Sequence, residues 1–149
     1  MAAPPEVATF TNPICRGADP WVIRDHANKR YLWCFSQGNQ IVLFAGDKLT
    51  DRGDRRVVWT APATGPISRE IWAPELHAWG DRWVIYFAAS DGNNVNHLAY
   101  ALRSKTSDPL GTYELKGPLA TGEGERGLAP QIWAIDLTLF SHRGKKYAI

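Results

Sequence analysis

The chain has 149 residues, of which 44% are apolar and 21% charged, and its formal net charge is +2. This balance is typical of one folded domain and argues against a disordered chain. Basic residues are scattered among acidic ones, so we expect no nucleic-acid partner and no polybasic membrane contact. No apolar run is long enough to span a membrane, and the first residues lack a signal-peptide pattern. We therefore expect a cytoplasmic protein, or an extracellular or periplasmic one if a leader is missing from this sequence.

Short β-rich runs separated by turn residues fill the chain, and helical periodicity is almost absent. A first group of predicted strands covers residues 20–23, 31–35, 41–44 and 57–59. A second group covers residues 75–79, 83–89, 97–103 and 113–115. A third group begins with residues 136–140 and 146–149. The sequence therefore predicts an all-β fold built from repeated four-strand meanders.

An acidic residue marks the opening strand of each group: Asp19, Glu75 and Asp136. The three lie 56 and then 61 residues apart, a spacing typical of the blades of a β-propeller. We expect blade one at about 10–60, blade two at about 70–118 and the start of blade three at about 130–149. About two and a half blades cannot close a ring, and Ile149 falls inside an apolar strand, so we expect a fragment of a longer propeller.

The innermost strands of a propeller line its axis, so acids at their starts should converge on one central pocket. Two carboxyl groups that share a cleft are what cleavage of a glycosidic bond requires. One activates a water molecule, and the other protonates the leaving oxygen. The seven tryptophans also suit a carbohydrate surface, although most of them are expected to fill the β core.

Three motifs make this expectation specific. They are Gly-Ala-Asp-Pro-Trp-Val at 17–22, Ile-Trp-Ala-Pro-Glu-Leu-His at 71–77 and Trp-Ala-Ile-Asp at 133–136. In this order and spacing they resemble the blade-opening motifs of glycoside hydrolase family 43, from about Phe10 to Ile149. The resemblance implies a five-bladed β-propeller and an inverting glycosidase. Members of the family are mainly α-L-arabinofuranosidases, β-xylosidases and arabinanases.

By position, the resemblance makes Asp19 the catalytic base that activates water. It makes Asp136 the second catalytic acid, which orients the general acid and raises its pKa, because like charges resist joint ionisation. The family's general acid is a Glu of the fourth blade, which would lie beyond Ile149. We therefore expect the full-length protein to be an enzyme and this piece to be inactive.

Four further residues are candidate substrate contacts. Glu75 is interpreted as a sugar-contacting or buried structural acid, and Trp72 as a stacking platform or a core residue. His77 is either a pocket hydrogen-bond donor or a structural histidine. Asn94 belongs to the polar loop 91–97, which contacts sugar hydroxyls or forms a plain turn.

The predicted substrate is an oligo- or polysaccharide such as arabinan, arabinoxylan or xylan, from which arabinofuranosyl or xylosyl units are removed. The alternatives are a non-catalytic carbohydrate-binding propeller and, ranked lower, a fructan hydrolase, whose Asn-Asp-Pro motif is Ala18-Asp19-Pro20 here. No cofactor is expected to be required and no metal ligand is named. The resemblance leaves a structural Ca²⁺ open. Cys15 and Cys34 permit a disulfide bond without arguing for one.

Overall fold

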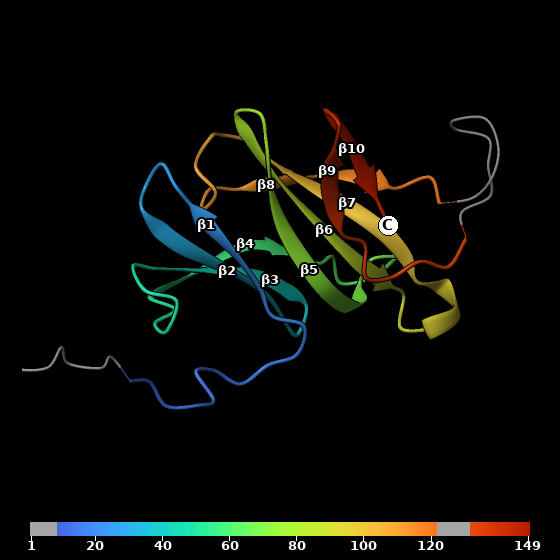
Figure 1. Cartoon of the computed structure of the whole chain (residues 1–149). Coiled ribbons are helices and arrows are strands. Elements are labelled where there is room, and N and C mark those ends of the chain that lie inside the picture. The colour runs from blue at the N-terminus through green and yellow to red at the C-terminus, as the bar shows by residue number, and fades with distance from the viewer. Residues whose placement is uncertain (1–8, 122–131) are drawn as a thin grey trace, which may run out of the picture.

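The computed structural model describes residues 9–121 and 132–149. The first of its sheets is a four-stranded antiparallel meander in which the strands pair in chain order (Figure 1). Its strands are β1 (Trp21–Asp25), β2 (Arg30–Gln37), β3 (Gln40–Gly46) and β4 (Asp54–Thr60).

A second meander repeats this layout, and a two-stranded hairpin follows it. The strands of the second sheet are β5 (Arg69–Trp79), β6 (Arg82–Ser90), β7 (Leu98–Ser104) and β8 (Tyr113–Pro118). A single 3₁₀ turn among the described residues, η1 (Asn94–Asn96), connects β6 to β7. The hairpin consists of β9 (Leu139–His142) and β10 (Lys145–Ala148). These elements confirm the predicted all-β class.

Several strand boundaries differ from the sequence prediction, and two of these differences, at the starts of β5 and β9, concern the candidate acids. Strand β5 begins at Arg69, ahead of the expected Glu75, and two irregularities in its pairing with β6 separate the early part from the regular part. Strand β9 begins at Leu139 instead of Asp136. The backbone of Asp136 has a φ of 55°, which is incompatible with an extended strand.

The first sheet buries both of its faces. Its central strands consist of successive apolar residues, and these point alternately to one face and the other. Leu32 and Cys34 face the second sheet in the main core, whereas Trp33 and Phe35 face a separate apolar cluster on the other side. That second cluster also packs against Cys15 from the segment before β1. The two cysteines therefore lie on opposite faces of the sheet, and both are free thiols.

The second sheet is also apolar on both faces. Leu76, Ile85 and Leu102 contribute to the core shared with the first sheet. On the far face, Val84, Tyr86 and Ala101 pack against side chains that include Leu137 and Leu139, next to and within the hairpin. The hairpin thus covers part of the second sheet, as the second sheet covers the first.

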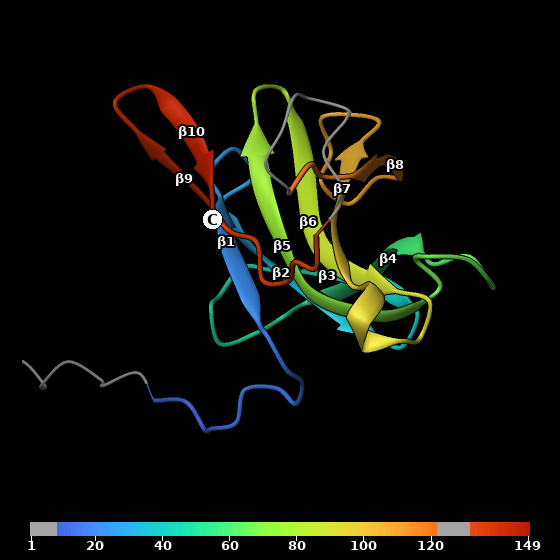
Figure 2. The same cartoon turned by 90° about the vertical axis from the view of Figure 1, so that its right-hand side faces the viewer.

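The opening strands of the three units lie next to one another (Figures 1 and 2). The indole Nε1 of Trp21 on β1 donates a hydrogen bond of 2.7 Å to the carbonyl oxygen of Leu76 on β5. Lys146 on β10 places its Nζ 4.1 Å from the ring centroid of Trp79, at the end of β5. Residues distant in sequence therefore meet along the line of these strands.

Candidate active site

The three predicted acids line one cavity of about 210 Å³. Asp19 reaches it from the residues just before β1, Glu75 from within β5, and Asp136 from the segment before β9. Pro20, Trp21 and Ala73 complete the lining. The convergence of acids expected from the repeated pattern is therefore present.

An unusual backbone conformation recurs at the cavity. Asp19, Ala73 and Asp136 have φ values of 48°, 41° and 55°, in the left-handed region that costs most residues roughly 1–2 kcal/mol. Aspartate tolerates this region better than alanine, because its short polar side chain can hydrogen-bond locally. The repeated conformation lies before β1, within the irregular part of β5 and before β9, and all three residues line the same cavity.

This conformation fixes the register of the repeat. Regular pairing begins two residues later in each unit, at Trp21 with Cys34, at Glu75 with Tyr86, and at Thr138 with Ile149.

The structural counterpart of Asp19 and Asp136 in the second unit is therefore Ala73. Glu75 corresponds to Trp21 and Thr138, so its use as the repeat marker was wrong by two positions. The matching pairs Asp19-Pro20 and Ala73-Pro74 were the signal in the sequence that could have shown this register.

Glu75 holds neighbouring elements together at the cavity. Its Oε2 accepts a hydrogen bond of 2.7 Å from Thr138 Oγ1, 63 positions away, and lies 2.9 Å from His77 Nε2. The carboxylate side chain is 19% exposed. Burial raises the pKa of the Cys34 thiol, and the negative charge of Glu75 raises it further. The Glu75 carboxylate therefore also affects a residue in the core of the first sheet.

His77 does not line the cavity, although it contacts a residue that does. Its ring centroid lies 4.8 Å from that of Trp21 and 5.8 Å from that of Tyr86. Together with its contact to Glu75, these neighbours place His77 behind the cavity wall, where it supports two lining side chains.

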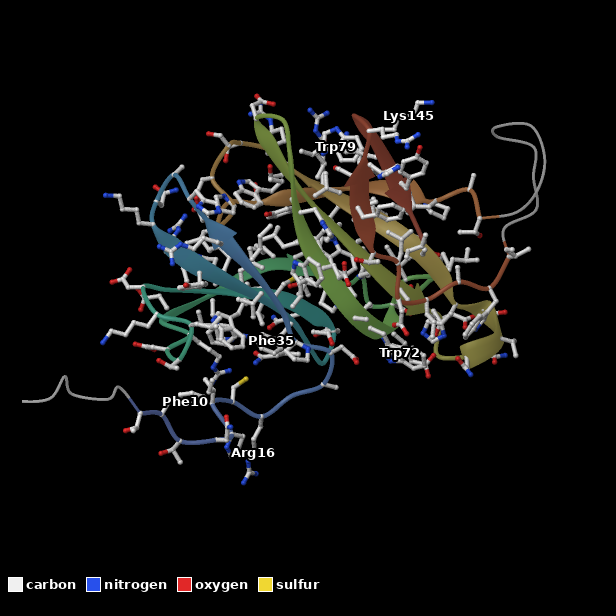
Figure 3. All side chains as sticks on the ribbon, in the orientation of Figure 1. Phe10, Arg16, Phe35, Trp72, Trp79 and Lys145 are labelled. Carbon is white, nitrogen blue, oxygen red and sulfur yellow. The ribbon has the colours of Figure 1, made fainter. Side chains whose placement is uncertain are left out.

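Trp72 and Asn94 lie outside the cavity lining as well. Figure 3 shows Trp72 at the end of the molecule that carries η1, at the opposite end of β5 from Trp79. Its indole stacks on the ring of His97 with a centroid separation of 3.9 Å. The carbonyl oxygen of Asn94 accepts a hydrogen bond of 2.8 Å from Trp133 Nε1. The cavity-lining residues that the sequence reasoning missed are thus Pro20, Trp21 and Ala73, and Thr138 is a further residue that bonds to the lining through Glu75.

Neither a metal centre nor a membrane-spanning helix is found in the described residues. Within 9–121 and 132–149, no group of three or more His, Cys, Asp or Glu side chains could hold a metal ion. No helix in that part of the chain is long and apolar enough to cross a membrane.

The arrangement suits hydrolysis of a polar substrate. Asp19 and Asp136 are both exposed, so their carboxylates are accessible to water and to a ligand in the cavity. A carboxylate can polarise a water molecule, and a second one can favour the protonated form of a neighbouring acid. The indole of Trp21 adds an aromatic surface to the same cavity.

Comparisons with known proteins agree on one family. The model of glycosyl hydrolases family 43 matches residues 10–149. An extracellular exo-α-(1→5)-L-arabinofuranosidase of Streptomyces chartreusis is 35% identical over 152 residues, which cover 97% of this chain and 44% of that enzyme.

Solved structures show the same fold. An α-L-arabinofuranosidase from Lactobacillus brevis superimposes with a TM-score of 0.79 at 26% identity, covering 93% of this chain and 45% of that one. An endo-arabinase from Bacteroides thetaiotaomicron superimposes with a TM-score of 0.70 at 18% identity, over 95% of this chain and 48% of that one. The chain thus spans less than half the length of these relatives. It belongs to family 43 of the glycosyl hydrolases.

Proposed function

We propose that this chain forms the base-bearing part of an inverting glycosidase that removes α-L-arabinofuranosyl or β-xylosyl units from a plant polysaccharide. The observation that supports it best is the convergence of Asp19 and Asp136 on one cavity. Identity of 35% to an exo-acting arabinofuranosidase favours arabinofuranosyl units, with arabinan as the first candidate substrate and arabinoxylan or xylan as further ones.

The proposed roles are those that the resemblance to family 43 gives to each position, and the placement of the carboxylates in one cavity supports them. Asp19 is the general base, which accepts a proton from the water that attacks the anomeric carbon. Asp136 orients the general acid and raises its pKa through the repulsion between like charges. Glu75, held by Thr138 and His77, shapes the cavity wall and contacts the sugar instead of transferring a proton.

The general acid is proposed to be a Glu outside residues 1–149, in a later blade. In this proposal the two four-stranded sheets are blades one and two, and the β9–β10 hairpin is the inner part of blade three. Residues 1–149 alone then lack the proton donor, which typically contributes about a hundredfold or more to the rate. We therefore propose that this part is inactive by itself.

Two further features belong to the proposal. An extracellular location is favoured because two Streptomyces relatives are named as extracellular enzymes. A structural Ca²⁺ ion stays part of the proposal, although within 9–121 and 132–149 no group of three or more His, Cys, Asp or Glu side chains could hold it.

The test compares the complete gene product with residues 1–149 alone on nitrophenyl α-L-arabinofuranoside and β-xyloside. The complete protein should hydrolyse one of them, and Asp19→Asn should lower kcat about a hundredfold or more, because the water loses its base. Asp81→Asn is the matched control, since Asp81 is an exposed turn residue outside the cavity. Proton NMR of the released sugar should show the inverted anomer first.

The possible results separate the alternatives. Full activity of Asp19→Asn would show that Asp19 is not the general base. Binding of arabino-oligosaccharides by the complete protein without hydrolysis of either glycoside would favour the non-catalytic carbohydrate-binding protein. Activity of residues 1–149 alone would contradict the proposal that the proton donor lies outside them.

A further inference from the structure

The Glu75 carboxylate accepts hydrogen bonds from two different units beside the cavity. Its Oε2 accepts a bond of 2.7 Å from Thr138 Oγ1 and lies 2.9 Å from His77 Nε2. A carboxylate oxygen has no hydrogen to donate, so the ring nitrogen is the donor in the second contact. The side chains of His77 and Glu75 are 11% and 19% exposed, so these bonds are largely shielded from solvent. One oxygen on β5 is thus held by a donor of β5 itself and by a donor of the segment before β9.

The Thr138 bond is one of two anchors that flank Asp136. Two residues after Asp136, the Thr138 side chain bonds to Glu75 on β5. Two residues before Asp136, the amide of Ala134 donates a hydrogen bond of 3.3 Å to the backbone carbonyl oxygen of His97, just before β7. The stretch that carries Asp136 is therefore tied to the second sheet and its loop on both sides.

The conformation of Asp136 depends on such anchors. Its φ is 55°, and a residue other than glycine persists in this left-handed region where the surrounding structure holds it. The residue is exposed at the cavity, so burial does not fix its position. The anchor at Ala134 ends on two backbone groups, whereas the anchor at Thr138 is made by two side chains. The Thr138 anchor can therefore be removed by substitution while the other anchor remains.

The residue after Glu75 connects β5 to the first unit in a different way. The carbonyl oxygen of Leu76 accepts a hydrogen bond of 2.7 Å from Trp21 Nε1, and Trp21 follows Asp19 by two residues. Because this bond ends on the backbone of β5, it does not depend on the Glu75 side chain. Loss of the Glu75 contacts should therefore displace Asp136 more than Asp19.

We propose that Glu75 is a positioning residue for Asp136: His77 fixes its carboxylate, and the carboxylate holds the Asp136 segment at the cavity through Thr138. The benefit to the reaction rests on the function proposed above, whereas the hydrogen bonds themselves do not. A displacement of about 1 Å in a reacting arrangement can cost about a hundredfold in rate. Neither Thr138 nor His77 lines the cavity, so substitutions there test positioning without removing a cavity-lining side chain.

The first measurement needs no substitution. Nitrogen-15 NMR of residues 1–149 should show a hydrogen on Nε2 of His77 at neutral pH, whether the ring is neutral or charged. A bare Nε2 would overturn the fixing of the Glu75 carboxylate by His77.

Hydrogen exchange in Thr138→Val tests the anchor itself. The Ala134 amide should exchange about tenfold faster than in unmodified residues 1–149, because release of one anchor lets the segment open at the other. Amides of β2 and β3 should not change, which shows that the variant is folded. Thr138→Ser keeps the hydroxyl and should exchange at close to the unmodified rate, as should Thr60→Val at the exposed end of β4. Unchanged exchange of the Ala134 amide in Thr138→Val would overturn the proposal.

The complete gene product tests the link to catalysis. Thr138→Val should lower kcat about tenfold with little change in KM, since only the placement of Asp136 is altered. Thr138→Ser should retain most of kcat. His77→Phe should also lower kcat, and His77→Gln should retain most of it, because the glutamine amide keeps an N–H for Glu75. His26→Phe is the matched control, because His26 is exposed in the turn after β1.

The kinetic results separate positioning from a structural role. Unchanged kcat in Thr138→Val would reduce the bond to a structural role and overturn the proposal. A loss of kcat in Thr138→Ser as large as in Thr138→Val would also overturn it, because the hydroxyl would then not be the group that matters. Faster exchange at Ala134 in a protein whose unmodified form hydrolyses neither glycoside would instead count against the proposed function, so the two failures are distinguishable.

Discussion

The hydrogen bond from Thr138 Oγ1 to Glu75 Oε2 allows a direct measurement of how firmly the third unit is attached to the second. It spans 2.7 Å between side chains 63 positions apart, and it joins β5 to the residue that pairs with Ile149 at the base of the hairpin. Thr138→Val removes the hydroxyl and keeps the branched shape of the side chain. The substitution therefore tests the hydrogen bond with little change in packing volume.

A hydrogen bond to a charged group contributes about 1.5–3 kcal/mol to stability. Since Glu75 is 19% exposed and keeps its contact with His77, we expect the lower end of this range, about 1.5 kcal/mol, for Thr138→Val. A double-mutant cycle with Glu75→Leu should return a coupling energy of about 1 kcal/mol, because the two groups are in direct contact.

The assay is equilibrium unfolding of residues 1–149 in urea, followed by circular dichroism and by tryptophan fluorescence. Hydrogen exchange of the β9 and β10 amides reports the hairpin separately and should accelerate about tenfold in Thr138→Val. Thr60→Val is the control, since Thr60 is exposed at the end of β4. A coupling energy below about 0.3 kcal/mol would refute the assigned role of Glu75, because distant independent sites show deviations of that size.

Two further predictions concern buried titratable groups. Burial raises the pKa of the Cys34 thiol, so a thiol reagent should label Cys15 alone in the native protein and both cysteines in denaturant; rapid native labelling of Cys34 would contradict its burial. Burial also raises the pKa of Tyr113, whose hydroxyl donates 2.8 Å to a backbone carbonyl, so its contribution to stability is full below the unfolded value of about 10 and is lost as the pH rises beyond it. Tyr113→Phe should cost about 1–3 kcal/mol in urea unfolding at neutral pH and weaken the alkaline loss of stability; an unchanged alkaline profile would contradict this assignment.

The strand pattern was accessible from sequence because it depends on local alternation. Leu32 and Cys34 face one side of β2, and Trp33 and Phe35 face the other, as a run of apolar residues buried on both faces requires. The start of β5 was not accessible in this way. Its early residues pair irregularly with β6, and such bulges depend on contacts with other parts of the chain.

The candidate site also contains residues that the sequence identified and residues whose placement it could not show. Asp19 and Asp136 were identified from their motifs, and both line the cavity. From its motif, Trp72 is expected to be a stacking platform for the sugar or a core residue. In the structure its ring stacks on His97 and does not line the cavity. The direction of a side chain next to a bulge cannot be read from strand alternation, because the extra residue breaks the period of two.

The sequence by itself determined the all-β class, the order of strands and the family, because alternation, turn residues and blade-opening motifs are local properties of the chain. The tertiary structure decided the register of the repeat: the pairs Asp19-Pro20 and Ala73-Pro74 indicate it for two units, but Leu137 follows Asp136, and the left-handed conformation that Asp19, Ala73 and Asp136 share is a property of the folded backbone. It also decided which partners Glu75 and His97 have. Those contacts join segments that are far apart in sequence, and their geometry depends on how whole sheets pack.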